Sequence, residues 1–239
     1  MIKYGELTTK GDNRGTFIKL LEQNIINALS DYKINIIYDF SRMYIECEEL
    51  DETLINKVNI ARQQFYISEA VSIAIVNTLR RYITNAEVAI KWPNDIYVGD
   101  MKICGILIEN TLSGCNIAQS IVGVGLNINQ REFLSDAPNP ISLIHFTNSD
   151  TSLDDILNEV TDEIISTFDH YDTSTQFDTL HDAYISMLWR RDGFHPYSTP
   201  DGTQFIARIT NVAPDGILTL TDTHNTSRYF AFKEVQAIL

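Results

Sequence analysis

The sequence predicts an α+β fold in which a mixed sheet packs against helices and a small all-β module follows at the C-terminal end. Apolar residues recur at helical spacing in several long segments, and short runs rich in Ile and Val alternate with them. After Arg191 the helical pattern stops, and only short strand-like runs separated by turn residues remain. A hydrophobic content of 44% is enough to form a buried core.

The first 60 residues predict the element order β-α-β-β-α. The strands are expected at residues 2–7, 34–38 and 43–47, where short apolar runs are bounded by polar turns. A helix is expected at 15–32 from the spacing of its apolar residues, and a second, short helix at 51–60. This front segment therefore predicts a small domain of its own.

Three helices and two β-rich regions are expected beyond residue 60. The helices cover 65–83, 151–171 and 177–190, and Ser152 followed by Asp155 is a capping signal for the second of them. One β-rich region comprises 88–90 and two buried strands, 102–109 and 118–127, joined by a polar turn at 110–115. The other comprises short strands at 203–209, 217–220 and 228–232, with turns at 200–202 and 214–216.

The densest group of residues suited to chemistry lies between the middle helices. Lys91 and Lys102 fall at strand ends, and the Pro-Asn-Asp that contains Asn94 and Asp95 predicts a turn. Lysine is a compact positive charge and asparagine both donates and accepts, so the group suits a phosphate or carboxylate. The alternative is a hairpin whose lysines are only solvated. Three glycines leave room for a ligand or another backbone to approach: Gly105, Gly123 and Gly125.

The composition excludes several functional classes. A net charge of −14 argues against a broad surface for nucleic acids or anionic membranes, and no apolar run is long enough to span a bilayer. Three scattered cysteines form no CxxC pair, and five dispersed histidines predict no zinc site. Reduced thiols without a signal peptide predict a cytoplasmic protein that contacts neither membrane nor DNA.

The motifs of residues 60–239 resemble those of biotin–protein ligases. Their order and spacing match in three blocks: Lys-Trp-Pro-Asn-Asp at 91–95, Lys-Ile-Cys-Gly-Ile-Leu-Ile-Glu at 102–109 and Gly-Val-Gly-Leu-Asn at 123–127. The resemblance also includes Asp-Ala-Pro-Asn-Pro-Ile-Ser-Leu at 136–143 and Tyr-Ile-Ser-Met-Leu-Trp-Arg at 184–190. The resemblance implies a class II synthetase-like core followed by an SH3-like C-terminal β-barrel.

By this resemblance, the protein would join biotin to AMP from ATP with Mg²⁺, then transfer the biotinyl group to a lysine of the biotin carrier protein of a carboxylase. Lys102 would be catalytic, because fixed positive charge between the biotin carboxylate and the α-phosphate stabilises the charge that develops there. A homodimer stays open. The remaining implied assignments are Asn94 and Asn127 to the nucleotide, Lys91 and Asp95 to the site lining, Asp95 also to the magnesium–triphosphate, and Gly105 and Ile106 to biotin.

Residues 1–57 resemble a different family, the tRNA 4-thiouridine sulfurtransferases, in their N-terminal ferredoxin-like domain. The motif is Ile-Lys-Tyr-Gly-Glu-Leu-Thr-Thr-Lys-Gly-Asp-Asn-Arg at 2–14, with Arg-Met-Tyr-Ile at 42–45. That family binds RNA beside this domain, which offers Lys10 and Arg14 as RNA contacts. A solvated turn explains both residues equally well. The first 65 residues carry 8 Lys and Arg against 10 Asp and Glu, which makes a poor phosphate-binding surface.

The front segment stands where biotin ligases carry a Thr/Ser-Asn motif and a Gly-Arg-Gly-Arg-x-Gly loop that orders over biotinyl-AMP, and this chain contains neither. Three parts are therefore predicted: a ferredoxin-like segment at 1–59, a partial ligase core at 60–191 and the SH3-like domain at 192–239. We expect impaired adenylate formation, since exclusion of water protects reactive intermediates. The alternatives are an accessory module for tRNA binding or thiolation and a non-catalytic interaction protein.

Overall fold

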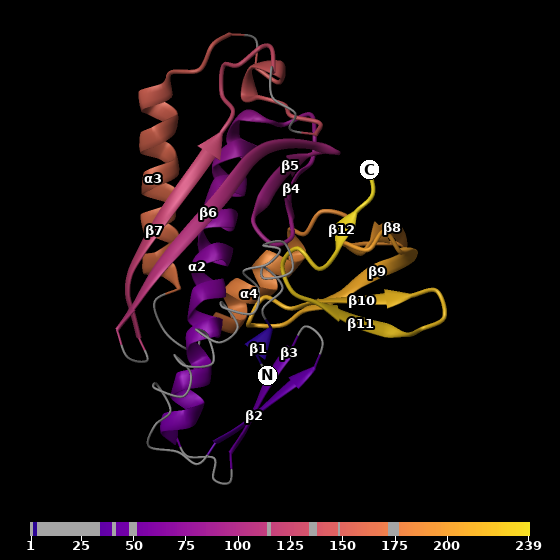
Figure 1. The fold of residues 1–239 in the computed structure, drawn as a ribbon. Helices are drawn as coiled ribbons and strands as arrows, with labels where there is room; N and C mark the ends of the chain where they lie inside the picture. The colour runs from indigo at the N-terminus through magenta and orange to yellow at the C-terminus, as the bar shows by residue number, and fades with distance from the viewer. Residues whose placement is uncertain are drawn as a thin grey trace.

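The computed structural model of the protein describes residues 2–3, 34–39, 42–47, 52–113, 116–133, 138–147, 149–171 and 177–239. Within these ranges the chain forms three sheets and several helices (Figure 1). Mixed α and β content is as the sequence predicts. The strands within each described sheet pair antiparallel, and parallel contacts are limited to two isolated bridges, so the expected mixed sheet is antiparallel here.

Helix α2 (Glu52–Tyr82) is the long central element of the molecule. The sequence predicts two helices, at 51–60 and 65–83, and the structure has one. That prediction was wrong because residues 61–64 (Ala-Arg-Gln-Gln) contain no glycine or proline and are good helix formers. All side chains from Ala70 to Val76 are buried, which is typical of a helix enclosed by a core. The predicted boundary at 59–60 falls inside this helix.

The central sheet has four antiparallel strands arranged in chain order: β4 (Val88–Lys91), β5 (Asp95–Val98), β6 (Met101–Ser113) and β7 (Asn116–Leu126). The predicted turn at 110–115 was too long, because pairing continues to Ser113 and resumes at Asn116. The prediction that both long strands are buried was also wrong. Leu107 and Ile121 are 66% and 58% exposed, since this antiparallel sheet packs against α2 on one face only.

Two further helices support the core. Helix α3 (Leu153–His170) begins at the predicted cap, where the Ser152 hydroxyl accepts a hydrogen bond from the Asp155 amide. Helix α4 (Phe177–Ser186) ends four residues before the predicted end at 190. The chain leaves the helix because the backbone of residues 187–189 pairs with Ile90 of β4, through two hydrogen bonds of 2.8 Å. A short 3₁₀ turn, η3 (Leu143–His145), lies between β7 and α3.

The C-terminal region forms a five-stranded antiparallel sheet of order β11-β10-β9-β8-β12. The sequence predicts three of these strands and misses β8 and β12, which are short and irregular in composition. Gly202 and Gly216 occupy the predicted turns with φ of +87° and +86°, where glycine is favoured. The bounds are β8 (His195–Ser198), β9 (Gln204–Val212), β10 (Leu218–Asp222), β11 (Ser227–Phe230) and β12 (Gln236–Ala237). Closure of this sheet into an SH3-like barrel stays a prediction.

The front of the chain contributes a three-stranded antiparallel sheet of order β1-β3-β2. Its strands are β1 (Ile2–Lys3), β2 (Ile34–Asp39) and β3 (Arg42–Cys47), which confirms the strands predicted at 34–38 and 43–47. The predicted helix at 15–32 and the proposed RNA contacts Lys10 and Arg14 lie outside the described residues. None of the described helices has the length and apolar character needed to span a bilayer.

Candidate active-site pocket

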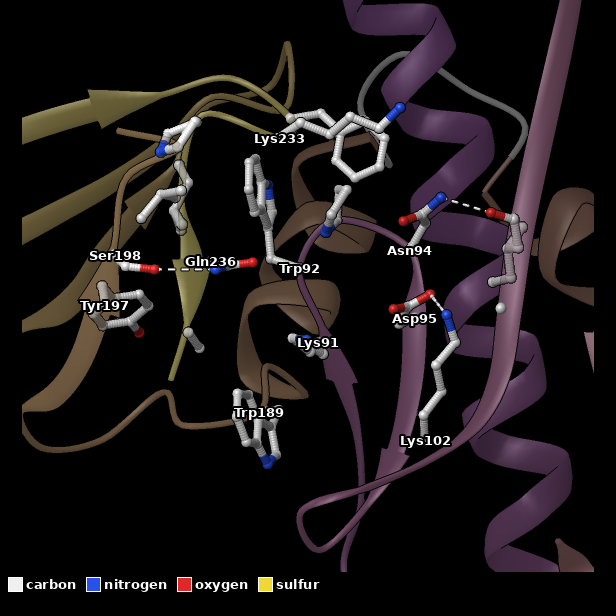
Figure 2. Close-up of a pocket in the computed structure, with 18 of the residues that line it drawn as sticks. Lys91, Trp92, Asn94, Asp95, Lys102, Trp189, Tyr197, Ser198, Lys233 and Gln236 are labelled. Carbon is white, nitrogen blue, oxygen red and sulfur yellow. Dashed lines mark hydrogen bonds and ion pairs between the residues drawn. The ribbon is translucent and has the colours of Figure 1, made fainter. Parts of the chain in front are cut away.

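A cavity of about 1240 Å³ opens between the central sheet and the C-terminal sheet (Figure 2). It exceeds the 300–1,000 Å³ or so that is usual for a small-molecule site, so it has room for more than one ligand group. One wall comes from the central sheet and the other mainly from β8, β9 and the C-terminal end of the chain. The residues predicted for the substrate site all line the cavity except Asn127: Lys91, Asn94, Asp95, Lys102, Gly105 and Ile106.

Strand register explains why these residues meet. In the strand register, Lys91 lies opposite Asp95, Asp95 opposite Gly105, and Gly105 opposite Gly125. One cross-strand row therefore runs over all four strands of the central sheet. The first two positions carry charged side chains and the last two carry none. Bare backbone at Gly105 and Gly125 leaves space above the sheet beside a lysine and a carboxylate. The row is therefore charged at Lys91 and Asp95 and leaves open space above Gly105 and Gly125.

Lys102 forms an ion pair with Asp95, with 2.7 Å between Nζ and Oδ1. A Cβ on Gly105 would lie 3.1 Å from the Lys102 Nζ, so the glycine makes room for the ammonium group. The Lys102 backbone is held by a neighbouring loop, since its amide donates to the Asn139 carbonyl and its carbonyl accepts from Ile141. Both charged side chains are about one-third exposed. Such a pair stabilises the fold by only about 0–1 kcal/mol and can be exchanged for a ligand.

The turn between β4 and β5 is anchored on both sides. The Trp92 indole donates to the Gly216 carbonyl of the C-terminal sheet at 3.0 Å, and the Tyr184 hydroxyl of α4 donates to the Pro93 carbonyl at 2.9 Å. Burial raises the pKa of Tyr184 well above its ordinary value, so the phenol remains a donor. In the view of Figure 2, Trp92 lies between the strand that carries Gln236 and the turn that joins β4 to β5.

Asn94 links this turn to the pocket floor. Its side-chain amide donates to the Ile106 carbonyl at 2.6 Å, and the Ile106 amide donates back to the Asn94 carbonyl at 3.2 Å. The sequence places Asn94 and Asp95 together in a turn, but Asp95 is already the first residue of β5. The difference follows from the pairing of Asp95 with Lys91, which closes the hairpin immediately after Asn94.

Lys91 has a different environment from Lys102. Its Nζ donates to the Tyr97 hydroxyl at 2.9 Å, and it lies 4.7 Å from the Tyr97 ring centroid and 5.9 Å from that of Trp189. Within the described part of the chain, no carboxylate pairs with this ammonium group. Aromatic faces stabilise a cation without neutralising it, so Lys91 presents positive charge to the cavity.

The C-terminal wall contains polar residues that sequence reasoning missed. Gln236 of β12 donates to the Ser198 hydroxyl of β8 at 3.1 Å, and Tyr197 lies beside them. Burial raises the pKa of Tyr197 to about 12. The two strands are only four and two residues long, too short to leave a recognisable pattern. Trp189 belongs to the 184–190 motif but has no role implied by it, and the structure places its ring under Lys91.

Asn127 is the predicted site residue that the pocket does not include. Its side-chain amide donates to the Ile141 carbonyl at 3.0 Å, and its backbone amide donates to Ile103. It therefore braces the loop that supports Lys102, and its role toward a nucleotide stays a prediction. Among the described residues, no group of three or more His, Cys, Asp or Glu side chains gathers as a metal site would require.

Two protein families account for different parts of the chain. Residues 50–127 match the biotin/lipoate A/B protein ligase family, and residues 1–60 match the ThiI ferredoxin-like domain. The chain thus joins a segment of each family, which confirms the hybrid that its motifs predict. The two matches overlap at 50–60, and residues 52–60 of this overlap form the first turns of α2.

Individual relatives repeat this division. The chain is 36% identical over 73 residues to the bifunctional ligase/repressor BirA of Salmonella typhimurium, covering 30% of this chain and 22% of that protein. It is 44% identical over 59 residues to a probable tRNA sulfurtransferase of Thermoanaerobacter, covering 24% and 16%. It spans about a fifth of the length of these curated relatives. The biotin protein ligase of Aquifex aeolicus shares the fold, with a TM-score of 0.58 and 19% identity over 73% of this chain and 75% of that one.

Proposed function

We propose that the protein is an ATP-dependent biotin–protein ligase. The observation that carries this proposal is the Lys102–Asp95 pair, which lies beside the bare backbone of Gly105 and Gly125 in a cavity large enough for two substrates. The family match over residues 50–127 supports it. The substrates would be biotin and ATP, and the acceptor would be a lysine of a biotin carrier protein.

The chemistry follows from the charges in this cavity. A biotin carboxylate oxygen attacks the α-phosphorus of ATP, the bond to the β-phosphate oxygen breaks, and pyrophosphate leaves as biotinyl-AMP forms. Lys102 would leave its ion pair with Asp95 and contact the reacting oxygens instead, because its ammonium group stabilises the negative charge that they share. The amine of the acceptor lysine then attacks the acyl carbon, AMP leaves, and one proton is released.

The other predicted residues would hold the substrates. Gly105 and Ile106 would flank biotin, while Asn94 and Asn127 would bind the nucleotide. Asp95 is the candidate partner for Mg²⁺, and as a single carboxylate it fits the usual arrangement in which this ion is held mainly by water and substrate phosphates.

The missing Gly-Arg-Gly-Arg-x-Gly loop has a predictable consequence. Without that loop, biotinyl-AMP would be held loosely and part of it would be lost to water. We therefore expect adenylate to accumulate in solution and then hydrolyse when the protein turns over without an acceptor. Rapid turnover with all adenylate retained on the protein would contradict this expectation.

The first test is isothermal titration of the protein with biotin, with and without Mg-ATP. We expect biotin binding that tightens with ATP, and this tightening should be lost in Lys102→Ala. The control is Arg208→Ala, which removes an exposed positive charge of β9 outside the cavity and should bind as the unchanged protein does. No heat from either ligand would overturn the proposal and favour a non-catalytic interaction protein.

The match of residues 1–60 to the ThiI ferredoxin-like domain favours a second candidate, an accessory module for tRNA binding or thiolation. The Lys10 and Arg14 contacts belong to this candidate. It requires tRNA affinity that falls steeply with salt, because phosphate contacts release counterions. Titration of tRNA at two salt concentrations, with a Lys10→Ala/Arg14→Ala variant, separates this candidate from the ligase.

A further inference from the structure

A partly buried histidine joins the core to the C-terminal sheet, away from the cavity. His181 of α4 contacts the Glu69 carboxylate of α2 at 2.5 Å through Nδ1, and the Val212 carbonyl of β9 at 2.8 Å through Nε2. The Glu69 side chain is only 4% exposed and that of His181 15%. Three elements from distant parts of the chain therefore meet at one imidazole ring.

Both partners of His181 present oxygens that accept hydrogen bonds. A neutral imidazole donates through one nitrogen only, so it would turn a lone pair toward one of these oxygens. The protonated ring donates to both, and its charge also offsets that of a buried carboxylate, which would otherwise be costly. The contacts at this joint therefore favour the charged form of His181.

The ionisable groups around the ring act in the same direction. The hydrogen bond to Glu69 raises the pKa of His181, the charges of Glu69 and Asp182 add to this, and burial opposes it. Tyr66 of α2 also faces the small hollow beside the ring, and the C-terminal sheet contributes the Val212 carbonyl and Pro214. The raised pKa places the change of charge above the ordinary histidine value of about 6.5.

The turn that follows Val212 contacts Trp92, a residue that lines the cavity. It is closed by hydrogen bonds from Gly216 to Ala213 and from Ala213 to Ile217, of 2.7 and 2.8 Å. The carbonyl of Gly216 then accepts from the Trp92 indole. Val212 and Gly216 stand at the two ends of one tight turn, so a displacement at Val212 moves the partner of Trp92.

We propose that His181 is a positioning residue that clamps the 212–216 turn onto α2 and thereby fixes the Trp92 side chain in the cavity. Protonated His181 donates a hydrogen bond to the Glu69 carboxylate and another to the Val212 carbonyl, and so keeps the turn in place. Loss of the proton removes one of the two hydrogen bonds and loosens the turn. This role depends on the joint itself and does not require the proposed ligase reaction.

The pH dependence has a definite sign. Because the pKa of His181 is raised in the folded protein, the clamp contributes fully below the ordinary histidine pKa of about 6.5. Its contribution is lost as the pH rises through the raised value. The hydrogen bond between Trp92 and Gly216 should weaken over the same interval.

The experiment follows the indole Nε1–H resonance of Trp92 in the ¹⁵N-labelled full-length protein from about pH 5 to pH 9. The chain has two tryptophans, so a Trp92→Phe variant identifies the resonance by its loss. We expect a shift whose midpoint lies above the ordinary histidine pKa. His181→Gln should abolish the transition, whereas His195→Gln, which changes a histidine of β8, should leave it intact.

Glu69→Gln provides a second test that does not remove the imidazole. A neutral amide in place of the carboxylate should move the midpoint downward, toward the ordinary histidine value, whereas a merely structural role for Glu69 would leave the midpoint unchanged. An unshifted midpoint in Glu69→Gln, or a transition that persists in His181→Gln, would overturn the proposal.

Discussion

The two walls of the cavity are built in different ways. The wall from the central sheet takes its residues from strands adjacent in sequence, where register alone aligns Lys91, Asp95, Gly105 and Gly125. The C-terminal wall is brought to the cavity by long-range contacts, such as the hydrogen bond between Trp92 and Gly216, which are 124 residues apart. The first wall is therefore set by hairpin geometry, and the second by how one sheet docks on the rest of the molecule.

The two walls therefore have different proposed roles, one in acting on the substrate and the other in shaping the cavity. The charged groups proposed to act on substrate lie on the sheet wall, where a change at the docking surface leaves their register intact. The shape of the cavity depends on the C-terminal wall, whose 212–216 segment contacts His181 of α4 and Trp92. Variants of the two walls should thus fail in different ways.

The largest expected effect is at Lys102 on the sheet wall. Lys102→Ala should lower the rate of adenylate formation about 10²–10³-fold, because a positive charge aimed at the reacting oxygens is lost. Lys91→Ala, which removes the lysine that has no described carboxylate partner, should mainly raise KM for ATP. The rate of pyrophosphate release over a range of ATP concentrations gives both kcat and KM. An equal loss of kcat in the two variants would remove the distinction between the lysines.

The docking turn is tested by two glycines that share one backbone conformation. Gly216 and Gly202 have φ of +86° and +87°, but a Cβ on Gly216 would lie 2.7 Å from the Phe65 ring, while nothing lies within 4 Å at Gly202. Gly202→Ala should cost about 1–2 kcal/mol of unfolding free energy from backbone strain. Gly216→Ala should cost about 1–3 kcal/mol more from the clash.

Urea denaturation measures these two costs. Phe65→Leu in the Gly216→Ala background should recover part of the difference, because the smaller side chain relieves the contact. Equal unfolding free energies for the two alanine variants would mean that the turn does not press against α2 as described.

A smaller effect is expected at Tyr184, which supports the turn from below. Tyr184→Phe removes the buried hydrogen bond to the Pro93 carbonyl and should cost about 1–2 kcal/mol of unfolding free energy. Tyr82→Phe is the matched control, since its hydroxyl bonds to the half-exposed Glu159 carboxylate on α3. That control should cost less than about 1 kcal/mol. A larger loss at Tyr82 than at Tyr184 would contradict the importance of the buried anchor.

The smallest effect tests a site away from both walls. Ser152→Ala removes the cap of α3 and should cost about 0.5–1 kcal/mol of unfolding free energy without changing ligand binding. Ser186→Ala, whose hydroxyl donates to the Ala183 carbonyl in the preceding turn of α4, serves as the comparison and should be nearly neutral. Altered biotin affinity in Ser152→Ala would show that α3 influences the cavity.

The tyrosine control also has a spectroscopic readout. The hydrogen bond to Glu159 raises the pKa of Tyr82 to about 12. A Glu159→Gln variant should therefore titrate a tyrosine closer to pH 10 in an ultraviolet pH titration, about where an ordinary phenol ionises. An unchanged titration curve would mean that this contact does not persist in solution.

The sequence by itself determined most of the sheet wall. Residues within about 35 positions of one another carry the Lys, Asn, Asp and Gly pattern, and hairpins bring such neighbours together through local register. The spacing of Lys91, Asn94, Asp95 and Lys102 is therefore sufficient to predict that they lie close together, and all four line the cavity. The exception is Asn127, whose side chain turns to the Ile141 carbonyl and supports the loop behind Lys102.

Only the tertiary structure decided the other wall. Ser198 and Gln236 lie on strands too short to leave a periodic signal, and His181 is one of five histidines with nothing in its neighbourhood to distinguish it. Its partners Glu69 and Val212 are 112 and 31 residues away. Side-chain pairs at such separations depend on how helices and sheets pack, which composition and periodicity do not encode. The docking of the C-terminal sheet, and with it the shape of the cavity, is therefore a property of the folded chain.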